Sequence, residues 1–244
     1  MITIRPERSE DASKVRHINE LAFGQPTEAD LVEKLRQACT NSLSLVAEDD
    51  TVVGHILFTP VVVENAGRRV LGMGLAPMAV LPDRQRQGIG SQLVRRGLDI
   101  LRERHCPFVV LVGHPEYYPR FGFEPCSMHG LTSQWEGMPD AAFMVLVLDV
   151  HAMAGVSGVA KYREEFNEVA QAAGRTGGSI LPSYRLGTDK RASRKVPTGR
   201  RELARHFPRS QLRGSCPLPG LCDNSRIRTS AAEAALKLQG LCRG

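Results

Sequence analysis

The feature that most constrains this chain is a glycine turn, RQRQGIGSQLV at residues 84–94, between a strand-like apolar run and a helical pattern. Gly88 and Gly90 stand one residue apart, and apolar residues then recur from Ile89 to Leu101 at helical spacing. A loop that enters a helix presents unpaired backbone N–H groups at the positive end of the helix dipole. Glycines let that backbone approach a bulky anion without Cβ clashes, so the turn is suited to a pyrophosphate.

Three glycine-rich phosphate-binding patterns can be compared with this turn. A Walker-type loop requires Gly-Lys followed by Ser or Thr, but Gly90 is followed directly by Ser91. A dinucleotide fingerprint requires a third glycine three residues after the second, and position 93 is a leucine. The third pattern is Gln or Arg, any two residues, Gly, any residue, then Gly or Ala. Residues 85–90, QRQGIG, match it at every fixed position, and Arg84 and Arg86 add positive charge nearby.

The segments around the turn predict an α/β fold with a mixed sheet, helices on its faces, and the order β-α-α-β-β-β-α-β-α-β. Apolar and alternating runs predict strands, whereas apolar side chains three or four residues apart predict helices. The expected strands are residues 2–6, 42–49, 51–64, 68–82, 108–113 and 141–150. The expected helices are residues 9–23, 28–38 and 88–105, a loop or short helix at 114–125, and a final short helix at 156–170.

The strand that leads into the glycine turn contains Gly72, Gly74 and Pro77, which are unusual in a central strand. Proline cannot donate a ladder hydrogen bond, and glycine marks bulges or places where another backbone approaches closely. These residues therefore predict a bulge or a splayed edge near a ligand.

The charge divides the chain into two parts. Residues 1–170 hold 17 Lys and Arg against 22 Asp and Glu, whereas residues 171–244 hold 15 against 4. The regular patterns end near Ala170, so we expect a domain over 1–170 and a basic, low-order tail over 171–244. The acidic balance of the domain argues against nucleic acid as a partner, except through the tail.

Six cysteines stand at positions 39, 106, 126, 216, 222 and 242, without a Cys-x-x-Cys pair or a zinc-ligand spacing. We therefore expect reduced thiols and no metal site. No early apolar segment is long enough for a signal peptide or a membrane span, which favours a cytoplasmic protein without a membrane partner.

Three stretches together resemble the GNAT superfamily of N-acetyltransferases, and most closely its YhbS-type group of small bacterial proteins. They are GHILFTPV at 54–61, LGMGLAPMAVLPDRQRQGIGSQLV at 71–94 and YYPRFGF at 117–123. The resemblance covers roughly residues 1–170 and none of the tail. It implies a GNAT fold with a mostly antiparallel sheet and acetyl-CoA as co-substrate. It also implies transfer of the acetyl group to an amine by direct attack on the thioester.

The resemblance also implies roles for particular residues. The strand before the turn would pair its backbone with the pantetheine arm of acetyl-CoA at Met78, Ala79 and Val80. A strand amide, of Met78 or Ala79, would polarise the thioester carbonyl. Tyr118 stands at the position of the family's usual general acid, four residues before Gly122, with Tyr117 as the adjacent alternative. The pyrophosphate would lie on backbone amides of Gln85, Arg86, Gln87, Gly88, Ile89, Gly90 and Ser91.

The general base is not specified by the sequence. His55 lies in an expected strand, where a buried and hydrogen-bonded histidine is the favoured interpretation over a base. His114 and Glu116 follow a buried strand and are candidates near the acceptor. Trp135 is interpreted as a packing residue, and Arg95 and Arg96 as a solvated helix face.

Three functions are compatible with these features. The first is an acetyltransferase acting on a small-molecule or peptide amine, and the resemblance adds the expectation of a homodimer. The second is a CoA-binding sensor or partner module with little catalysis, which would tolerate Tyr118→Phe. The third is a nucleic-acid-associated protein that uses the tail, whose binding would weaken steeply with salt.

Overall fold

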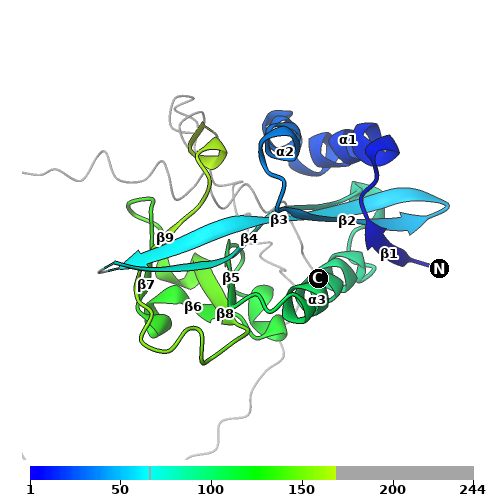
Figure 1. Ribbon diagram of the computed structural model, residues 1–244. Helices are drawn as coiled ribbons and strands as arrows, with labels where there is room; N and C mark the ends of the chain where they lie inside the picture. Colours follow the sequence, from blue (N-terminus) through cyan, green and yellow to red (C-terminus); the bar gives the residue numbers. More distant parts are fainter. Residues whose placement is uncertain (66, 169–244) are drawn as a thin grey trace, which may run out of the picture. The chain divides into compact units, whose positions relative to one another are not determined.

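The computed structural model describes residues 1–65 and 67–168 (Figure 1). The tail expected over 171–244, its three cysteines and the last two residues of the expected domain lie outside the described residues. The helices are α1 (Ala12–Phe23), α2 (Thr27–Ala38) and α3 (Ile89–Glu103). The strands are β1 (Thr3–Pro6), β2 (Leu43–Asp49), β3 (Thr51–Asn65), β4 (Arg68–Val80), β5 (Phe108–Val112), β6 (Glu124–Pro125), β7 (Leu131–Ser133), β8 (Phe143–Val147) and β9 (Gly158–Lys161).

The strands form one mixed sheet in the order β1-β2-β3-β4-β5-β8-β6, and β9 pairs with both β3 and β7. Pairing is antiparallel except between β4 and β5 and between β7 and β9. α1 and α2 lie on one face of the sheet and α3 on the other (Figure 1). The predicted fold class, a mostly antiparallel mixed sheet flanked by helices, is therefore confirmed.

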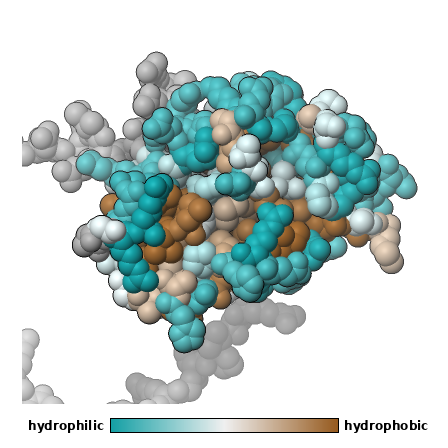
Figure 2. All heavy atoms as spheres, in the orientation of Figure 1, coloured by the Kyte–Doolittle hydropathy of each residue, from teal (hydrophilic) through white to brown (hydrophobic). Residues whose placement is uncertain are grey.

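Each face of the sheet has its own hydrophobic core. Val15 and Ile18 of α1 and Leu35 of α2 belong to one core cluster. Leu93 and Leu98 of α3 belong to the other. The outer surface of α1 and α2 is hydrophilic, and hydrophobic side chains become visible below these helices, at the level of the sheet (Figure 2). The three-residue and four-residue spacings in the sequence thus mark the inward sides of the helices.

The predicted bulge lies in β4 at Ala76 and Pro77. Ile56 pairs with Met78 and Phe58 with Leu75, so two residues of β4 stand opposite one residue of β3. The two glycines of this strand are explained by close packing and not by the bulge. A Cβ at Gly72 would lie 2.6 Å from the Phe108 ring, and a Cβ at Gly74 would lie 2.5 Å from the Tyr162 ring.

The prediction of a final helix at 156–170 is wrong for the first part of this range. Residues 158–161 form β9, and helical backbone begins at residue 165. The physical reason is the length of β3. β2 pairs with β3 only as far as Phe58, and β9 pairs with Val62, Val63 and Glu64 of the remaining edge. An unpaired edge would leave backbone groups without partners, so tertiary pairing overrides the local helical pattern.

Two further findings concern the described part of the chain. None of its helices combines the length and apolarity that a bilayer span requires. Its three cysteines, at positions 39, 106 and 126, are free thiols.

Candidate active site

The glycine turn leads into α3 through two residues in the left-handed backbone region. Arg86 has a φ of 62° and Gly88, the residue that precedes the helix, has a φ of 79°. No side chain caps this end of α3. A Cβ at Gly88 would meet no atom within 4 Å, so the space in front of the turn is open. The first-turn N–H groups at Ile89, Gly90 and Ser91 lack helical carbonyl partners, which suits this end for an anion.

Side chains of the turn hold the turn itself. The amide Nε2 of Gln85 donates to the Val80 carbonyl at 3.1 Å, and that of Gln87 donates to the Asp83 carbonyl at 3.2 Å. The Gln85 bond joins the turn to the end of β4, and the Gln87 bond closes the turn on itself. The sequence predicted a role for the backbone N–H groups of Gln85 and Gln87. It did not predict these hydrogen bonds of their side chains.

Arg84 does not add free charge to the turn as the sequence suggested. Its guanidinium donates to the carboxylate of Asp49, which also accepts from the N-terminal ammonium of Met1 at 3.0 Å. Both partners of Asp49 lower the pKa of its carboxyl, with the Arg84 hydrogen bond as the larger cause. Arg86 is exposed on the turn itself. Asp49 ends β2 and Arg84 follows β4, and the pairing of both strands with β3 brings the two residues together, which no local pattern in the sequence contains.

β4 has one edge without a strand partner beside the turn, within the described residues. β5 pairs with β4 only from Met73 to Leu75. From Met78 to Val80 the other edge of β4 pairs with β3, opposite residues 54–56. The side chains of Met78, Ala79 and Val80 are all buried, so these residues can offer a ligand only their backbone. This is the splayed edge that the sequence predicted.

Tyr117 and Tyr118 follow β5, and Tyr117 reaches the first turn of α3. The phenol oxygen of Tyr117 is 3.3 Å from Ser91 Oγ in the first turn of α3. Tyr118 begins a short 3-10 helix and packs its ring edge-on against Tyr117, with centroids 5.0 Å apart. Both rings are buried. The Tyr117 phenol thus lies beside the first turn of α3, and the Tyr118 ring packs against Tyr117; the acid role of Tyr118 stays a prediction.

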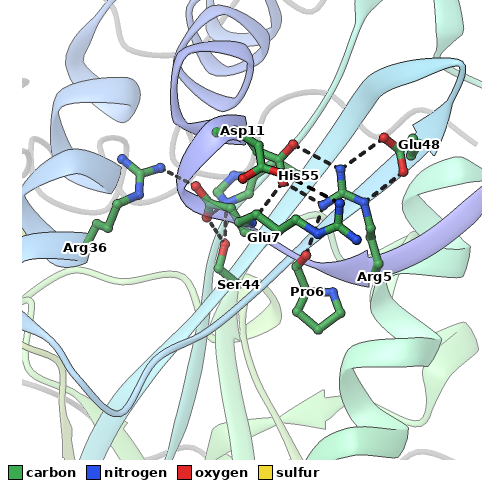
Figure 3. A network of polar contacts seen from close by, with 10 residues as sticks. Arg5, Pro6, Glu7, Asp11, Arg36, Ser44, Glu48 and His55 are labelled. Carbon is green, nitrogen blue, oxygen red and sulfur yellow. Dashed lines mark hydrogen bonds and ion pairs between the residues drawn. The ribbon is translucent and has the colours of Figure 1, made fainter.

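His55 lies in a buried polar network between β1, β2, β3 and α1 (Figure 3). Asn19 Nδ2 donates to the Val15 carbonyl at 2.8 Å, which orients the amide, and its other hydrogen points to His55 Nδ1 at 3.2 Å. His55 Nδ1 is therefore the acceptor, and the Nε2 hydrogen faces Ser44 Oγ at 3.0 Å. Both ring nitrogens are engaged, because the Nδ1 lone pair already accepts the Asn19 hydrogen bond. His55 therefore has no free lone pair for base catalysis. The structure agrees with the buried, hydrogen-bonded role.

The same network contains two carboxylates held in the charged form. Glu7 accepts from Ser44 and from Arg36 of α2, the latter at 2.5 Å. Burial alone would raise the pKa of Glu7, but the His55 ring, whose Nε2 lies 3.7 Å from the carboxylate, the Ser44 hydrogen bond and the charge of Arg36 outweigh it and lower the pKa to about 2. The Arg5 guanidinium bonds both oxygens of Asp11 at 2.6 and 3.0 Å and lowers the pKa of Asp11 to about 2 (Figure 3).

The remaining candidates lie in three different environments. The His114 carbonyl accepts the backbone N–H of Tyr117 at 3.0 Å, which places His114 at the start of the tyrosine turn. Glu116 is exposed in the same turn. Trp135 packs against Tyr162, with ring centroids 5.1 Å apart, and donates its indole N–H to Asn167, as expected of a packing residue. Within residues 1–65 and 67–168, no group of three His, Cys, Asp or Glu could hold a metal ion.

The sequence of this chain is similar to a known protein family and to known proteins. A family model described as an acetyltransferase (GNAT) domain matches residues 3–126. The chain is 40% identical over 166 residues to YhbS of Escherichia coli strain K12, which is described as an uncharacterized N-acetyltransferase. The match covers 67% of this chain and 98% of that relative.

Crystal structures of two similar proteins contain CoA or acetyl-CoA. YhbS from Escherichia coli in complex with CoA matches with a TM-score of 0.63 and 39% identity, over 68% of this chain and 92% of that one. A GNAT family acetyltransferase from Brucella melitensis in complex with acetyl-CoA matches with a TM-score of 0.55 and 36% identity. That match covers 68% of this chain and 98% of the other.

Proposed function

Because the chain belongs to the GNAT acetyltransferase family, we propose that it moves the acetyl group of acetyl-CoA to a primary amine. The observation that carries the proposal is an anion-binding helix terminus directly beside an unpartnered strand edge. A ligand with a diphosphate at one end and an amide-containing arm at the other has the chemistry for both. The CoA and acetyl-CoA bound to the two similar proteins support the same ligand.

In this proposal the diphosphate of acetyl-CoA binds the backbone N–H groups of residues 85–91. Gly88 supports this part, because the space in front of it is open and its φ of 79° suits glycine. The pantetheine arm then pairs with the backbone of Met78, Ala79 and Val80 as an added strand. A backbone amide of Met78 or Ala79 donates to the thioester oxygen, where negative charge develops.

The reaction is a direct acyl transfer. The amine nitrogen attacks the thioester carbonyl, the carbon–sulfur bond breaks, and the CoA thiolate leaves while the nitrogen loses a proton. Tyr118 is the proposed general acid that protonates the thiolate. A free phenol has a pKa of about 10 and a thiol one of about 8.5, so this proton transfer is uphill by about 1.5 pKa units. The Tyr118 phenolate then regains a proton from solvent, which balances the proton that the nitrogen loses. Tyr117 is the alternative, although its phenol already contacts Ser91.

The acceptor is proposed as a small-molecule or peptide amine. Its proton leaves to solvent or to a group of the tyrosine turn, and His114 and Glu116 are the described candidates. Their place at the start of this turn supports a position near the reacting nitrogen. His55 is not a candidate, because both of its ring nitrogens are engaged.

Thermal unfolding of the full chain with and without acetyl-CoA tests the binding step. A ligand at a hundred times its Kd stabilises the folded state by about 2.7 kcal/mol, which gives a readily measured rise in Tm. Gly88→Val should abolish the rise, because a Cβ would fill the open space. Gly155→Val is the matched control, since Gly155 has a φ of 68° and open space but lies far along the chain. No rise for the unaltered protein would refute the proposal.

Release of free CoA thiol with a panel of primary amines tests the chemistry. Tyr118→Phe should lower kcat by about a hundredfold and leave the affinity for acetyl-CoA unchanged. Tyr117→Phe should change kcat much less. A Tyr118→Phe variant with normal kcat would exclude this residue as the acid. An unaltered protein that binds acetyl-CoA but is inactive with every amine would favour a binding module instead.

A further inference from the structure

Two arginines stand over aromatic rings beside the glycine turn. Arg120 Cζ lies 4.6 Å from the centroid of the Tyr117 ring. Arg95 Cζ, on α3, lies 5.6 Å from the centroid of the Phe121 ring. The Tyr117 and Phe121 rings touch each other edge-on, with centroids 5.4 Å apart. The two guanidinium groups are therefore held on one connected aromatic pair, although they come from different elements.

This aromatic pair is attached to the anion-binding end of α3. Tyr117 contacts Ser91 through its hydroxyl at 3.3 Å, and Ser91 lies in the first turn of the helix. Arg95 follows Ser91 by four residues, so both side chains lie on the same side of α3. Arg95 and Arg120 thus extend a positively charged rim away from the glycine turn.

The charges on this rim are not compensated by the described part of the protein. Arg84 pairs with Asp49, and Arg96, the neighbour of Arg95, has Glu103 within 3.9 Å. Arg95 and Arg120 are exposed, and across residues 1–65 and 67–168 neither has a carboxylate within 4.0 Å. A stacked guanidinium keeps its N–H edge available for a bidentate contact with a phosphate. The rim therefore combines two positioned cations with the positive end of a helix.

We propose that Arg95 and Arg120 bind the 3′-phosphate of acetyl-CoA, an inference that rests on the proposed function. The ligand carries two separate anionic groups, the diphosphate and a monophosphate on the ribose. Backbone amides of residues 85–91 can hold the first without any cationic side chain. The monophosphate carries close to two negative charges at neutral pH and therefore requires cations. The rim holds two cationic side chains next to the proposed diphosphate position. The site distinguishes the phosphorylated ligand from the same molecule without its 3′-phosphate.

Isothermal titration of the full chain with acetyl-CoA and with 3′-dephospho-acetyl-CoA tests the inference. The unaltered protein should bind acetyl-CoA about tenfold more tightly, the effect of two exposed ion pairs. The double variant Arg95→Gln with Arg120→Gln should bind both ligands equally, at the level of the dephosphorylated one. Glutamine removes the charge and keeps a planar group over each ring. Arg96→Gln is the matched control and should keep the preference.

The outcomes separate this inference from the proposed function. Equal binding of both ligands by the unaltered protein would overturn the phosphate site and leave acetyl-CoA binding intact. A double variant that keeps the tenfold preference would overturn it as well. Binding of neither ligand would overturn the proposed function itself. Both arginines are exposed, so an unchanged Tm of the double variant without ligand is expected and checks that the fold is intact.

Discussion

Replacing Glu7 by glutamine should remove a defined part of the acid sensitivity of this protein. Glu7 is nearly buried and accepts hydrogen bonds from Ser44 and Arg36 inside the His55 network. Its pKa falls from an ordinary 4.5 to about 2 in the folded protein. Because the folded pKa lies below the unfolded one, the carboxylate stabilises the fold above pH 4.5, and this stabilisation is lost as the pH falls toward 2.

The magnitude follows from the two pKa values. One pKa unit is about 1.4 kcal/mol, so the full contribution of Glu7 at pH 7 is roughly 3 kcal/mol. Between pH 7 and pH 3 about 2 kcal/mol of it disappears, because the unfolded carboxyl is then mostly protonated and the folded one is not. Asp11, whose pKa is also about 2, adds a further loss of about 1 kcal/mol in the same range.

Urea unfolding at pH 7, 5, 4 and 3 measures this directly. The free energy of unfolding of Glu7→Gln should be lower at pH 7, and should fall by about 2 kcal/mol less than that of the unaltered protein down to pH 3. Glu10→Gln is the control, because Glu10 is exposed and its ion pair with Arg8 contributes little. Parallel pH curves for the unaltered protein and Glu7→Gln would refute the reasoning.

Three further predictions concern the cores. Gly97→Ala should lower the free energy of unfolding by about 1–3 kcal/mol, because its Cβ would lie 2.4 Å from the Phe58 ring and push α3 from the sheet; thermal unfolding would show a lower Tm. Tyr162→Phe should raise the free energy of unfolding by up to about 1 kcal/mol in urea, because the buried hydroxyl has no hydrogen-bond partner among the described residues. Cys126 should resist alkylation in the folded state, since burial raises the pKa of its thiol; rapid labelling counted by mass spectrometry would contradict this.

The sequence predicted the elements whose pattern is local. The spacing of apolar residues located all three long helices, and the glycines of residues 85–90 located the N-terminal end of α3. Pro77 indicated the bulge of β4, because proline fits poorly in a paired strand. These features depend on neighbours within a few residues, which is the range that a linear pattern can report.

The parts that the sequence did not predict depend on distant partners. β9 forms because β3 extends past β2, and a window around residues 158–161 does not contain that fact. The sequence interpretation assigned Gly72 and Gly74 to a bulge or a splayed edge, whereas the rings of Phe108 and Tyr162 occupy the space of their missing Cβ atoms. The stacking of Arg120 on Tyr117 had a local signal, since the two are three residues apart, but only the short helix brings them together.

The internal hydrogen bonds of the glycine turn have a consequence for the thermodynamics of recognition. Gln85 fixes the turn to β4, Gln87 fixes it to Asp83, and Arg84 fixes it to the hairpin between β2 and β3. A preorganised turn loses little conformational entropy when an anion arrives, so the affinity reflects the contacts that are made rather than the ordering of a loop. It follows that cutting one of these side-chain tethers should weaken binding at the proposed site through entropy, although that site uses only backbone amides of the turn.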